Sequence, residues 1–226
     1  MSEVLRLENI SMSFPSPGGQ GELEILKNIS LSVEKGASVS VMGRSGSGKS
    51  TLLYVSSLIE RPTGGNVYFS GRKATDLSER QLAALRRDMM GFVFQNSLLM
   101  EDFTALENVM LPLMNRGEGR KKASLAAMQA LEAMGLADRA GHRPFELSGG
   151  ERQRTAIARA MVTRPEIIFA DEPTGALDES SQRVVEDIFA ALADEGIALL
   201  LVTHDPDFAL RMKQRYILEH KELRQC

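Results

Sequence analysis

The sequence has a single cysteine, Cys226, which is the last of its 226 residues. One thiol builds no disulfide framework within the chain and supplies too few ligands for a cysteine-based zinc site. This usage is typical of a protein in a reducing cytosol. Tryptophan is missing altogether, and aromatic residues make up only 5% of the chain. Few aromatic side chains are therefore available for stacking on a ligand.

The sequence also lacks long apolar runs. None approaches the roughly 20 residues that span a bilayer, and the N-terminal segment MSEVLRLENI has no basic start followed by an apolar core, so it is not a signal peptide. We expect a chain that is not integral to a membrane, although it could sit on a membrane protein. The formal net charge of −3 gives no sign of a nucleic-acid-binding face, so we expect no nucleic-acid partner.

Strand-like and helix-like segments alternate along most of the chain. Such βα alternation predicts an α/β fold with a mainly parallel sheet covered on both faces. Between about residues 97 and 150 the apolar spacing becomes helical, which predicts a mainly helical subdomain inside the α/β chain. Strands are predicted at 3–14, 26–36, 37–43, 66–71, 91–95, 166–173 and 197–205, and helices at 49–59, 104–114, 121–135, 147–163, 180–196 and 207–215.

The segment GRSGSGKST, which starts at Gly43, fits the P-loop pattern without a gap. It follows a β-rich run and opens a helix, and this context is the one that the pattern requires. Lys49 would neutralise β- and γ-phosphate oxygens, Ser50 would hold Mg²⁺ and Thr51 would reach the α-phosphate. The backbone that would curl around the phosphates comprises Gly43, Arg44, Ser45, Gly46, Ser47 and Gly48.

Two acidic residues, Asp171 and Glu172, end the apolar run in IIFADE. Ligands collect at the carboxyl ends of strands in open α/β sheets. Because successive side chains of a strand point in opposite directions, we expect the two carboxylates to differ in role. Asp171 suits Mg²⁺, directly or through water, whereas Glu172 suits polarisation of an attacking water.

His204 and Gln95 also follow strand-like runs, in LLLVTHD and GFVFQ. A histidine at a strand end beside a nucleotide-binding sheet favours a role at the γ-phosphate over a structural one. The Gln95 amide could ligate Mg²⁺, orient water or serve only as a hydrogen-bonded strand end. The residues alone leave these alternatives for Gln95 open.

Phe14 ends the first predicted strand, before a turn-rich loop at residues 15–24. An aromatic ring there could stack on adenine, but pattern alone favours a core phenylalanine.

Seven of the 12 methionines fall between Met89 and Met134. They could line a groove that accepts a partner helix, although gap filling in the core is the simpler interpretation.

Ser148, Gly149 and Gly150 form a second possible phosphate nest, in ELSGGERQR. Free backbone N–H groups and the positive end of the helix dipole both favour an anion there. The P-loop lies far upstream and already provides a phosphate cradle. The residues alone therefore do not say why one chain carries two nests.

Together, the motifs resemble those of the nucleotide-binding subunit of ABC transporters, over about residues 3–218. The resemblance implies a P-loop ATPase with a RecA-like, mainly parallel sheet, an antiparallel β subdomain and an inserted helical subdomain. The whole chain, 1–226, would be one ATPase domain with its core in 1–96 and 151–226 and its helical signature subdomain in about 97–150. The matching segments are GRSGSGKST, FVFQ at Gln95, LSGGERQR from Leu147, IIFADEP, GALD at Asp178 and THD at His204.

This resemblance implies a homodimer that sandwiches two ATP molecules head to tail. Each ATP would lie between the P-loop of one copy and Ser148–Gly150 of the other, with Asp178 linking the two sites. It also supports Phe14 as the adenine-stacking aromatic, although tyrosine is more usual there. The catalytic set would be Glu172 as base, His204 as γ-phosphate sensor, Lys49 and Gln95, and Mg²⁺ would lie at Ser50, Gln95 and Asp171. Each motif keeps the residues that the family uses, so we expect an active ATPase.

Within the family, the sequence is similar to the lipoprotein-releasing (LolD-like), macrolide-exporter (MacB-like) and antimicrobial-peptide-resistance branch. DFTALENV and HRPFELSGGERQRTAIARA look most like the lipoprotein-releasing type, whereas GALD is more usual in the macrolide type. The branch implies permease partners with periplasmic domains and a peripheral place on the cytoplasmic side of the inner membrane. The expected function is to power lipoprotein release, with macrolide or antimicrobial-peptide export and a cell-division complex as alternatives.

The C-terminal segment YILEHKELRQC departs from the aspartate–glycine turn that is usual in this family. We therefore expect the last strand to be irregular.

Overall fold

The computed structural model describes residues 3–16, 19 and 21–226. They form two compact units, one of Met1–Ala83 with Ala193–Cys226 and the other of Ala84–Leu192. The boundaries between the units fall in helix α2 (Glu79–Met89) and helix α6 (Glu179–Asp194). In the part of the chain that the structure describes, no helix combines the length and the apolar character that a membrane span needs.

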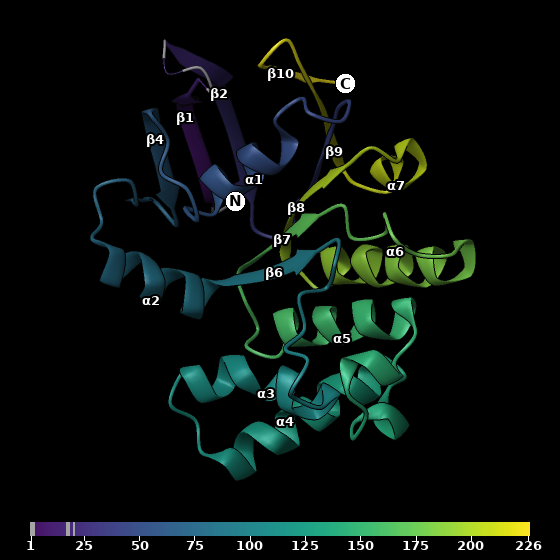
Figure 1. Ribbon diagram of the computed structural model, residues 1–226. Helices are drawn as coiled ribbons and strands as arrows, with labels where there is room; N and C mark the ends of the chain where they lie inside the picture. Colours follow the sequence, from purple (N-terminus) through teal and green to yellow (C-terminus); the bar gives the residue numbers. More distant parts are fainter. Residues whose placement is uncertain (1–2, 17–18, 20) are drawn as a thin grey trace. The chain divides into compact units, whose positions relative to one another are not determined.

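An antiparallel sheet with strand order β2-β1-β4-β5 belongs to the first unit (Figure 1). Leu5 and Leu7 of β1 are fully buried, as the alternating sequence predicts. Of the loop predicted at 15–24, residues 17, 18 and 20 lie outside the described residues, and the chain is already extended again at Glu22. The strands are β1 (Glu3–Pro15), β2 (Glu22–Glu34), β4 (Gly64–Phe69) and β5 (Arg72–Lys73).

The first unit also contains four strands in the order β10-β9-β3-β8. β3 is parallel to both β8 and β9, and every residue of β8 is buried. Continuous apolar runs such as ALLLV are typical of strands covered on both faces. The strands are β3 (Ser38–Met42), β8 (Ala198–Thr203), β9 (Gln214–Glu219) and β10 (Glu222–Gln225), and the helices are α1 (Lys49–Ser56) and α7 (Pro206–Leu210).

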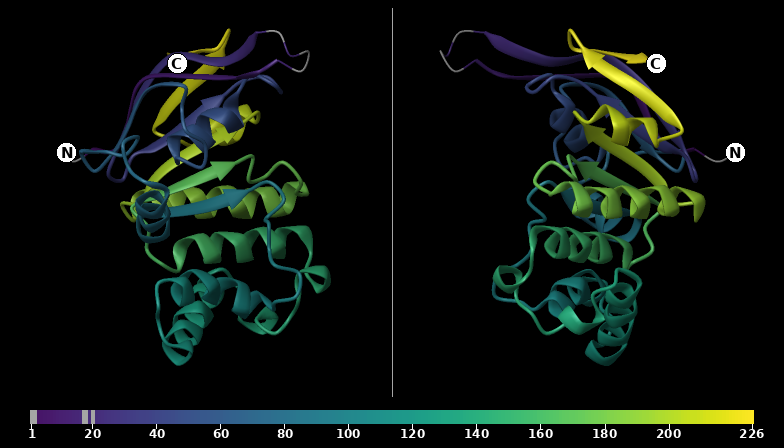
Figure 2. Two further views of the ribbon diagram at one scale, coloured as in Figure 1. Left: turned by 60° about the vertical axis from the view of Figure 1, so that its left-hand side comes forward. Right: turned by 90° about the vertical axis from the view of Figure 1, so that its right-hand side faces the viewer.

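The second unit combines a parallel strand pair with a helical bundle (Figure 2). Thr104 caps α3 through a capping box with Glu107, in which each side chain accepts the other residue's N–H, at 3.2 and 3.1 Å. The elements are β6 (Met90–Phe94), β7 (Ile167–Asp171), α3 (Ala105–Asn115), α4 (Arg120–Ala133), α5 (Gly149–Met161) and the short 3₁₀ helices η1 (Ala137–Arg139) and η2 (Pro144–Glu146).

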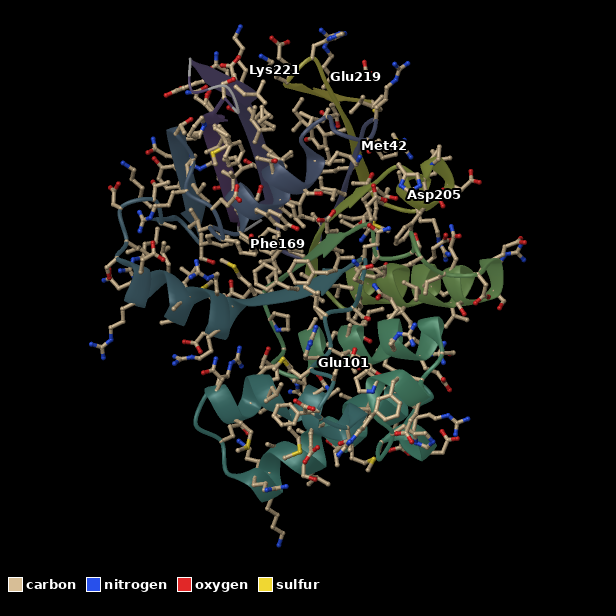
Figure 3. The ribbon with its side chains drawn as sticks, in the orientation of Figure 1. Met42, Glu101, Phe169, Asp205, Glu219 and Lys221 are labelled. Atoms are coloured by element: carbon tan, nitrogen blue, oxygen red, sulfur yellow. The ribbon has the colours of Figure 1, made fainter. Side chains whose placement is uncertain are left out.

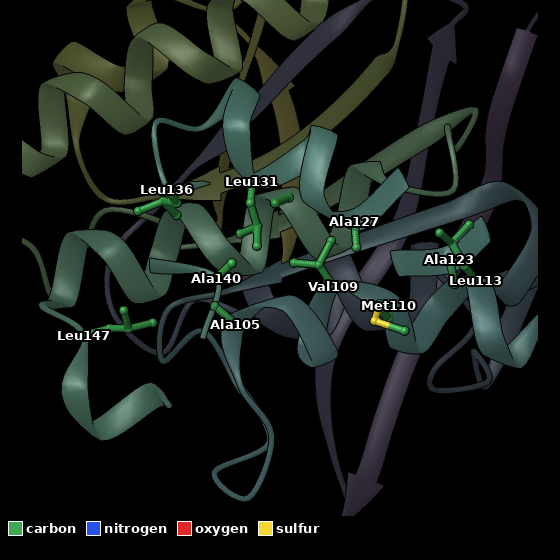
Figure 4. Close-up of a cluster of buried hydrophobic side chains, with 11 residues drawn as sticks. Ala105, Val109, Met110, Leu113, Ala123, Ala127, Leu131, Leu136, Ala140 and Leu147 are labelled. Carbon is green, nitrogen blue, oxygen red and sulfur yellow. The ribbon is translucent and has the colours of Figure 1, made fainter. Parts of the chain in front are cut away.

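Small and branched apolar side chains join the helices of the second unit in one core cluster (Figure 4). Residues 97–150, all of which the structure describes, contain helices and no strand. That this range acts as a separate subdomain stays a prediction. The strands and helices of the two units confirm the predicted α/β fold class. The cluster consists of Ala105, Val109, Met110, Leu113, Ala123, Ala127, Leu131, Leu136, Ala140, Leu147 and Ala158.

Two predictions about the C-terminal region are wrong. The helix predicted at 207–215 ends at Leu210, because the chain from Gln214 onward pairs with β3 as strand β9. The last strand is regular, since β9 and β10 pair without a shift around a turn at His220 and Lys221 (Figure 3). These two residues have positive φ values of 50° and 69°, so they supply the left-handed backbone that the usual aspartate–glycine turn would provide.

Candidate functional site

The P-loop leaves the end of β3 and wraps around the side chain of Lys49. The Lys49 ammonium donates hydrogen bonds to the carbonyls of Gly43 at 2.9 Å and Arg44 at 3.2 Å. The Lys49 residue is only 8% exposed although it carries a charge. Its cation is therefore held at the loop by backbone carbonyls.

Two P-loop glycines have no room for a side chain. A Cβ on Gly43 would lie 2.6 Å from Ser47 Oγ and 2.7 Å from the Leu218 carbonyl. A Cβ on Gly48 would lie 2.8 Å from Ile25, and the φ of Gly48 is +99°. Gly46, in contrast, has a φ of +78° and no atom within 4 Å of an added Cβ. The loop is thus closely packed at its base and open at its tip.

The P-loop also presents unsatisfied polar groups. Among the described residues, Ser47 Oγ is one of two buried side-chain oxygens or nitrogens without a hydrogen-bond partner. No side chain caps α1, whose N-cap is Gly48 and whose first turn has no acidic residue. A helix start leaves N–H groups without intrahelical acceptors, and an anion satisfies them. These features fit the phosphates of a nucleotide, next to the half-buried Ser50 and Thr51.

His204 lies at the same sheet edge as the P-loop. Met42, the last residue of β3, pairs with Thr203, the last residue of β8, so Gly43 and His204 leave neighbouring strands together. His204 is exposed, and the strand-end position predicted for it is confirmed. Figure 3 marks this edge by Met42 and Asp205.

Phe14 lies in β1 opposite Leu23 of β2. Its side chain is half-buried and is not part of the buried core, so the core interpretation that pattern favoured is wrong. A half-buried aromatic residue is compatible with contact to a base.

Asp171 and Glu172 differ in backbone conformation, which strand alternation does not predict. Asp171 is the last residue of the fully buried strand β7 and is 8% exposed. Glu172 is not a strand residue, because its φ of 46° places it in the left-handed region. The alternation argument therefore does not apply to Glu172. A non-glycine residue in this conformation costs about 1 kcal/mol, and such strain clusters at functional sites.

Gln95 lies beside the turn that follows Glu172. Phe94 of β6 pairs with Asp171 of β7, so Gln95 emerges at the same edge as the two carboxylates. A Cβ on Gly175 would be 2.9 Å from the Gln95 Nε2, and the Gly175 N–H donates to the Glu172 carbonyl at 3.0 Å. Gln95, Asp171 and Glu172 are thus brought together, as the sequence predicts. Among the described residues, no three histidine, cysteine or acidic side chains cluster as a metal site.

The second nest carries its own cap. Ser148 Oγ accepts the N–H of Glu151 at 3.2 Å, and Glu151 accepts the N–H of Ser148 at 2.8 Å. Hydrogen bonds from the Ser148 N–H and from the Arg139 guanidinium hold the pKa of Glu151 at about 2. Of the three N–H groups predicted to be free, at Ser148, Gly149 and Gly150, the one at Ser148 is therefore engaged. The amides of Gly149 and Gly150 have no acceptor inside the helix.

Asp178 lies just before α6 and binds the first turn of that helix. Its carboxylate accepts hydrogen bonds from the Ser180 hydroxyl and from the backbone and hydroxyl of Ser181. These bonds, with Ser180 first, hold the pKa of Asp178 far below its usual range. Sequence reasoning missed both serines, although an aspartate followed by serines at a helix start is a recognisable capping pattern.

Helix α5 also holds the loop that carries Gln95. Gln153 donates to the Phe94 carbonyl at 3.1 Å, and Arg159 donates to the carbonyls of Ser97 and Leu98, both at 2.7 Å. Ser97 and Leu98 have positive φ values of 53° and 45°. Because these side chains bind backbone carbonyls, nothing in the local sequence indicates their partners, and sequence reasoning missed them.

The chain is similar to known proteins both in sequence and in fold. Residues 26–175 match the model of a family described as ABC transporter. The chain is 45% identical over 209 residues to the "Lipoprotein-releasing system ATP-binding protein LolD" of Aquifex aeolicus, covering 92% of this chain and 91% of the relative. It is 48% identical over 199 residues to the LolD protein of Bdellovibrio bacteriovorus, covering 88% and 90%.

Two solved structures of the ATP-binding cassette MJ0796 have a very similar fold. One is a dimeric post-hydrolysis state bound to ADP and Pi, with a TM-score of 0.91 and 37% identity over 98% of this chain and 97% of that one. The other, described as a dimeric bacterial ABC transporter cassette, has a TM-score of 0.91 and 38% identity over the same shares.

Proposed function

Because the chain belongs to the ABC transporter family, we propose that it is the ATP-hydrolysing subunit of a complex that releases lipoproteins from the inner membrane. The observation that carries this proposal is the P-loop, in which Lys49 is fixed by two carbonyls and the adjacent α1 has no side-chain cap. The 45–48% identity to proteins named for lipoprotein release supports the cargo class.

The residues of the P-loop hold the nucleotide in this proposal. The amides of residues 43–48 donate hydrogen bonds to the phosphates, the Lys49 ammonium neutralises their charge, and Thr51 contacts the α-phosphate. The half-buried Phe14 stacks on adenine. Ser50, Gln95 and Asp171 would hold Mg²⁺, because their side chains offer the oxygen ligands that this cation prefers, and the bound cation would supply positive charge to the phosphates.

Glu172 is the general base in this proposal. Its carboxylate takes a proton from the attacking water, and Gln95 helps to orient that water. His204 contacts the γ-phosphate oxygens and stabilises the charge that develops there. The left-handed backbone at Glu172 costs the fold some stability. Because such conformations cluster at functional sites, it supports a catalytic role for this carboxylate.

A second copy of the chain completes each site. We assign Ser148, Gly149 and Gly150 to the γ-phosphate held by the neighbour's P-loop, with Asp178 beside them at the interface. The dimeric cassettes with 37–38% identity support this assembly. A ligand that belongs to the neighbour explains why one chain carries two nests. We also assign residues 97–150 to a helical subdomain that presents the second nest.

Integral-membrane permease subunits with periplasmic domains are the partners in this proposal, and the chain is peripheral, on the cytoplasmic side of the membrane. A groove of about 230 Å³ in the helical region supports a docking site for such a partner. Met114 at this groove is 44% exposed, whereas Met110 is buried, so the methionines serve both the core and the surface. The groove is lined by Phe103, Glu107, Met110, Leu111, Met114 and Arg120.

Copurification from membranes tests this function. The tagged chain should recover a permease with a large periplasmic domain, identified by mass spectrometry. Met114→Glu should lose that permease while ATP binding persists, because a charge in an apolar groove is costly to bury. Leu125→Glu on α4, at a side chain that is 64% exposed and outside the groove, is the matched control. Recovery of soluble partners alone would contradict the proposal.

A further inference from the structure

Ser181 contacts both segments that we assign to the neighbour's ATP. Its N–H donates to Asp178 Oδ1 at 3.0 Å, and its hydroxyl donates to Asp178 Oδ2 at 2.8 Å. It therefore binds both oxygens of one carboxylate. A carboxylate held at both oxygens cannot rotate without breaking one of these bonds.

Ser181 also lies against the second nest. A Cβ added to Gly150 would be 2.5 Å from Ser181 Oγ and 2.8 Å from Ser181 Cβ, both shorter than real Cβ contacts. The neighbouring Gly149 meets nothing closer than 3.7 Å. Of the two glycines, Gly150 is the one at which a side chain would force a shift, and Ser181 is the residue that it would meet.

The first turn of α5 is fixed on its other side by the capping box of Ser148 and Glu151, which Arg139 supports at 2.9 Å. The capping box thus fixes the backbone at the start of α5, and Gly150 in this turn lies against Ser181. A displacement of Asp178 breaks its bonds to Ser181 or moves Ser181 with it, and a displacement of Gly150 toward Ser181 is opposed by close contact.

We propose that Ser181 is a positioning residue that sets the spacing between Gly150 and Asp178, so that the two segments engage the neighbour's ATP as one rigid edge. This proposal rests on the proposed assignment of those segments to the neighbour's nucleotide. Ser181 itself touches neither the nucleotide nor the reacting atoms; it acts through Gly150 and Asp178.

A size exchange tests the contact with Gly150. In a Glu172→Gln background with ATP, dimer formation is measured by sedimentation, while binding of a fluorescent ATP analogue to the P-loop and thermal unfolding are measured separately. Gly150→Ala should weaken dimer formation at least about tenfold, equivalent to about 1.4 kcal/mol. Ser181→Gly removes both atoms that the new methyl group would meet, so Gly150→Ala should weaken dimer formation much less in a Ser181→Gly background than it does alone.

The matched pair Ser180→Ala and Ser181→Ala tests the link to Asp178. Each variant removes one hydroxyl that donates to the Asp178 carboxylate, at 2.6 and 2.8 Å respectively, but only Ser181 also meets Gly150. Ser181→Ala should lower kcat about threefold or more beyond Ser180→Ala. The affinity of the P-loop for ATP and the thermal midpoint should differ little between the two variants.

The outcomes separate the two proposals. If Gly150→Ala weakens dimer formation equally with and without Ser181→Gly, or if the two serine variants have equal kcat, Ser181 is not a positioning residue. If the Glu172→Gln reference itself forms no dimer with ATP, the assignment of the second nest to a neighbour fails instead. A smaller effect of Gly150→Ala in the Ser181→Gly background, together with the difference in kcat, establishes the proposal.

Discussion

The Nε of Arg139 donates a hydrogen bond of 2.9 Å to Oε1 of Glu151, the residue that follows the glycines of the second nest. The other oxygen of Glu151 accepts the N–H of Ser148. Arg139 thus supports the helix start that carries Ser148 without belonging to any of the motifs that the sequence presents.

This arrangement makes stability depend on acid pH. The Ser148 N–H and Arg139 hold the pKa of Glu151 at about 2, below its ordinary value of 4.5. Because the folded state has the lower pKa, the contribution of this carboxylate is fully present above about pH 4.5 and is lost as pH falls toward about 2. Urea unfolding between pH 2 and 7 should therefore show a shallower acid decline for Glu151→Gln, which should also be less stable at neutral pH.

The control for this experiment is Glu132→Gln, which removes an exposed carboxylate of α4. Its unfolding free energy should follow that of the wild type. An unchanged acid decline in Glu151→Gln would show that Arg139 and Ser148 do not stabilise the ionised carboxylate.

Arg159→Met should destabilise the second unit. Arg159 donates two hydrogen bonds of 2.7 Å to the carbonyls of Ser97 and Leu98, and its loss leaves those carbonyls with one partner fewer. Hydrogen bonds that involve a charged group contribute about 1.5–3 kcal/mol each. We expect urea unfolding to show a loss of about 2–4 kcal/mol, after relaxation of the loop. Arg183→Met, at a side chain that is 73% exposed, should cost less than about 0.5 kcal/mol.

Gly43→Ala should weaken ATP binding. The new methyl group would meet Ser47 Oγ and the Leu218 carbonyl at 2.6 and 2.7 Å, so the base of the P-loop has to shift. Overpacking of this kind costs about 1–3 kcal/mol, and we expect the Kd for a fluorescent ATP analogue to rise roughly tenfold or more. Gly119→Ala has open space and a φ of −66°, so it should bind as the wild type does. Equal affinities for both variants would contradict the geometry described for the loop.

Glu172→Gln should lower kcat about 100-fold or more, because a neutral amide does not accept the proton of the attacking water. ATP binding should persist, and dimers with bound ATP should accumulate. Phosphate release and sedimentation measure the two effects. Glu179→Gln, at a side chain that is 81% exposed, should keep its turnover. Hydrolysis near the wild-type rate in Glu172→Gln would refute the assignment of the base.

The sequence predicts most elements because their patterns are long and local. The run at β8 is apolar throughout and is buried throughout. The helix predicted at 207–215 fails because its last residues pair with a strand distant in sequence, which local periodicity does not reveal. His220 and Lys221 adopt left-handed backbone without glycine, so the sequence gives little sign of their turn.

The candidate site residues fall into two groups. Asp171, Gln95 and His204 lie at or just after the carboxyl ends of strands and Lys49 opens α1 after the P-loop, so a local motif predicts where each of them lies in its own unit. Ser181, Arg139 and Arg159 act through hydrogen bonds and close contacts between separate elements. Such contacts depend on tertiary packing, and a single sequence contains no direct signal for them.

Lipoprotein release by ATP hydrolysis is tested most directly by the fraction of lipoproteins retained in the inner membrane of cells whose only copy of this protein carries Glu172→Gln. Membrane fractionation and quantitative mass spectrometry give this fraction, with Glu179→Gln as the control. Lipoproteins should accumulate in the inner membrane with Glu172→Gln and distribute normally with the control. Normal distribution with Glu172→Gln, in cells where ATP turnover by the variant is abolished, would contradict the proposed function.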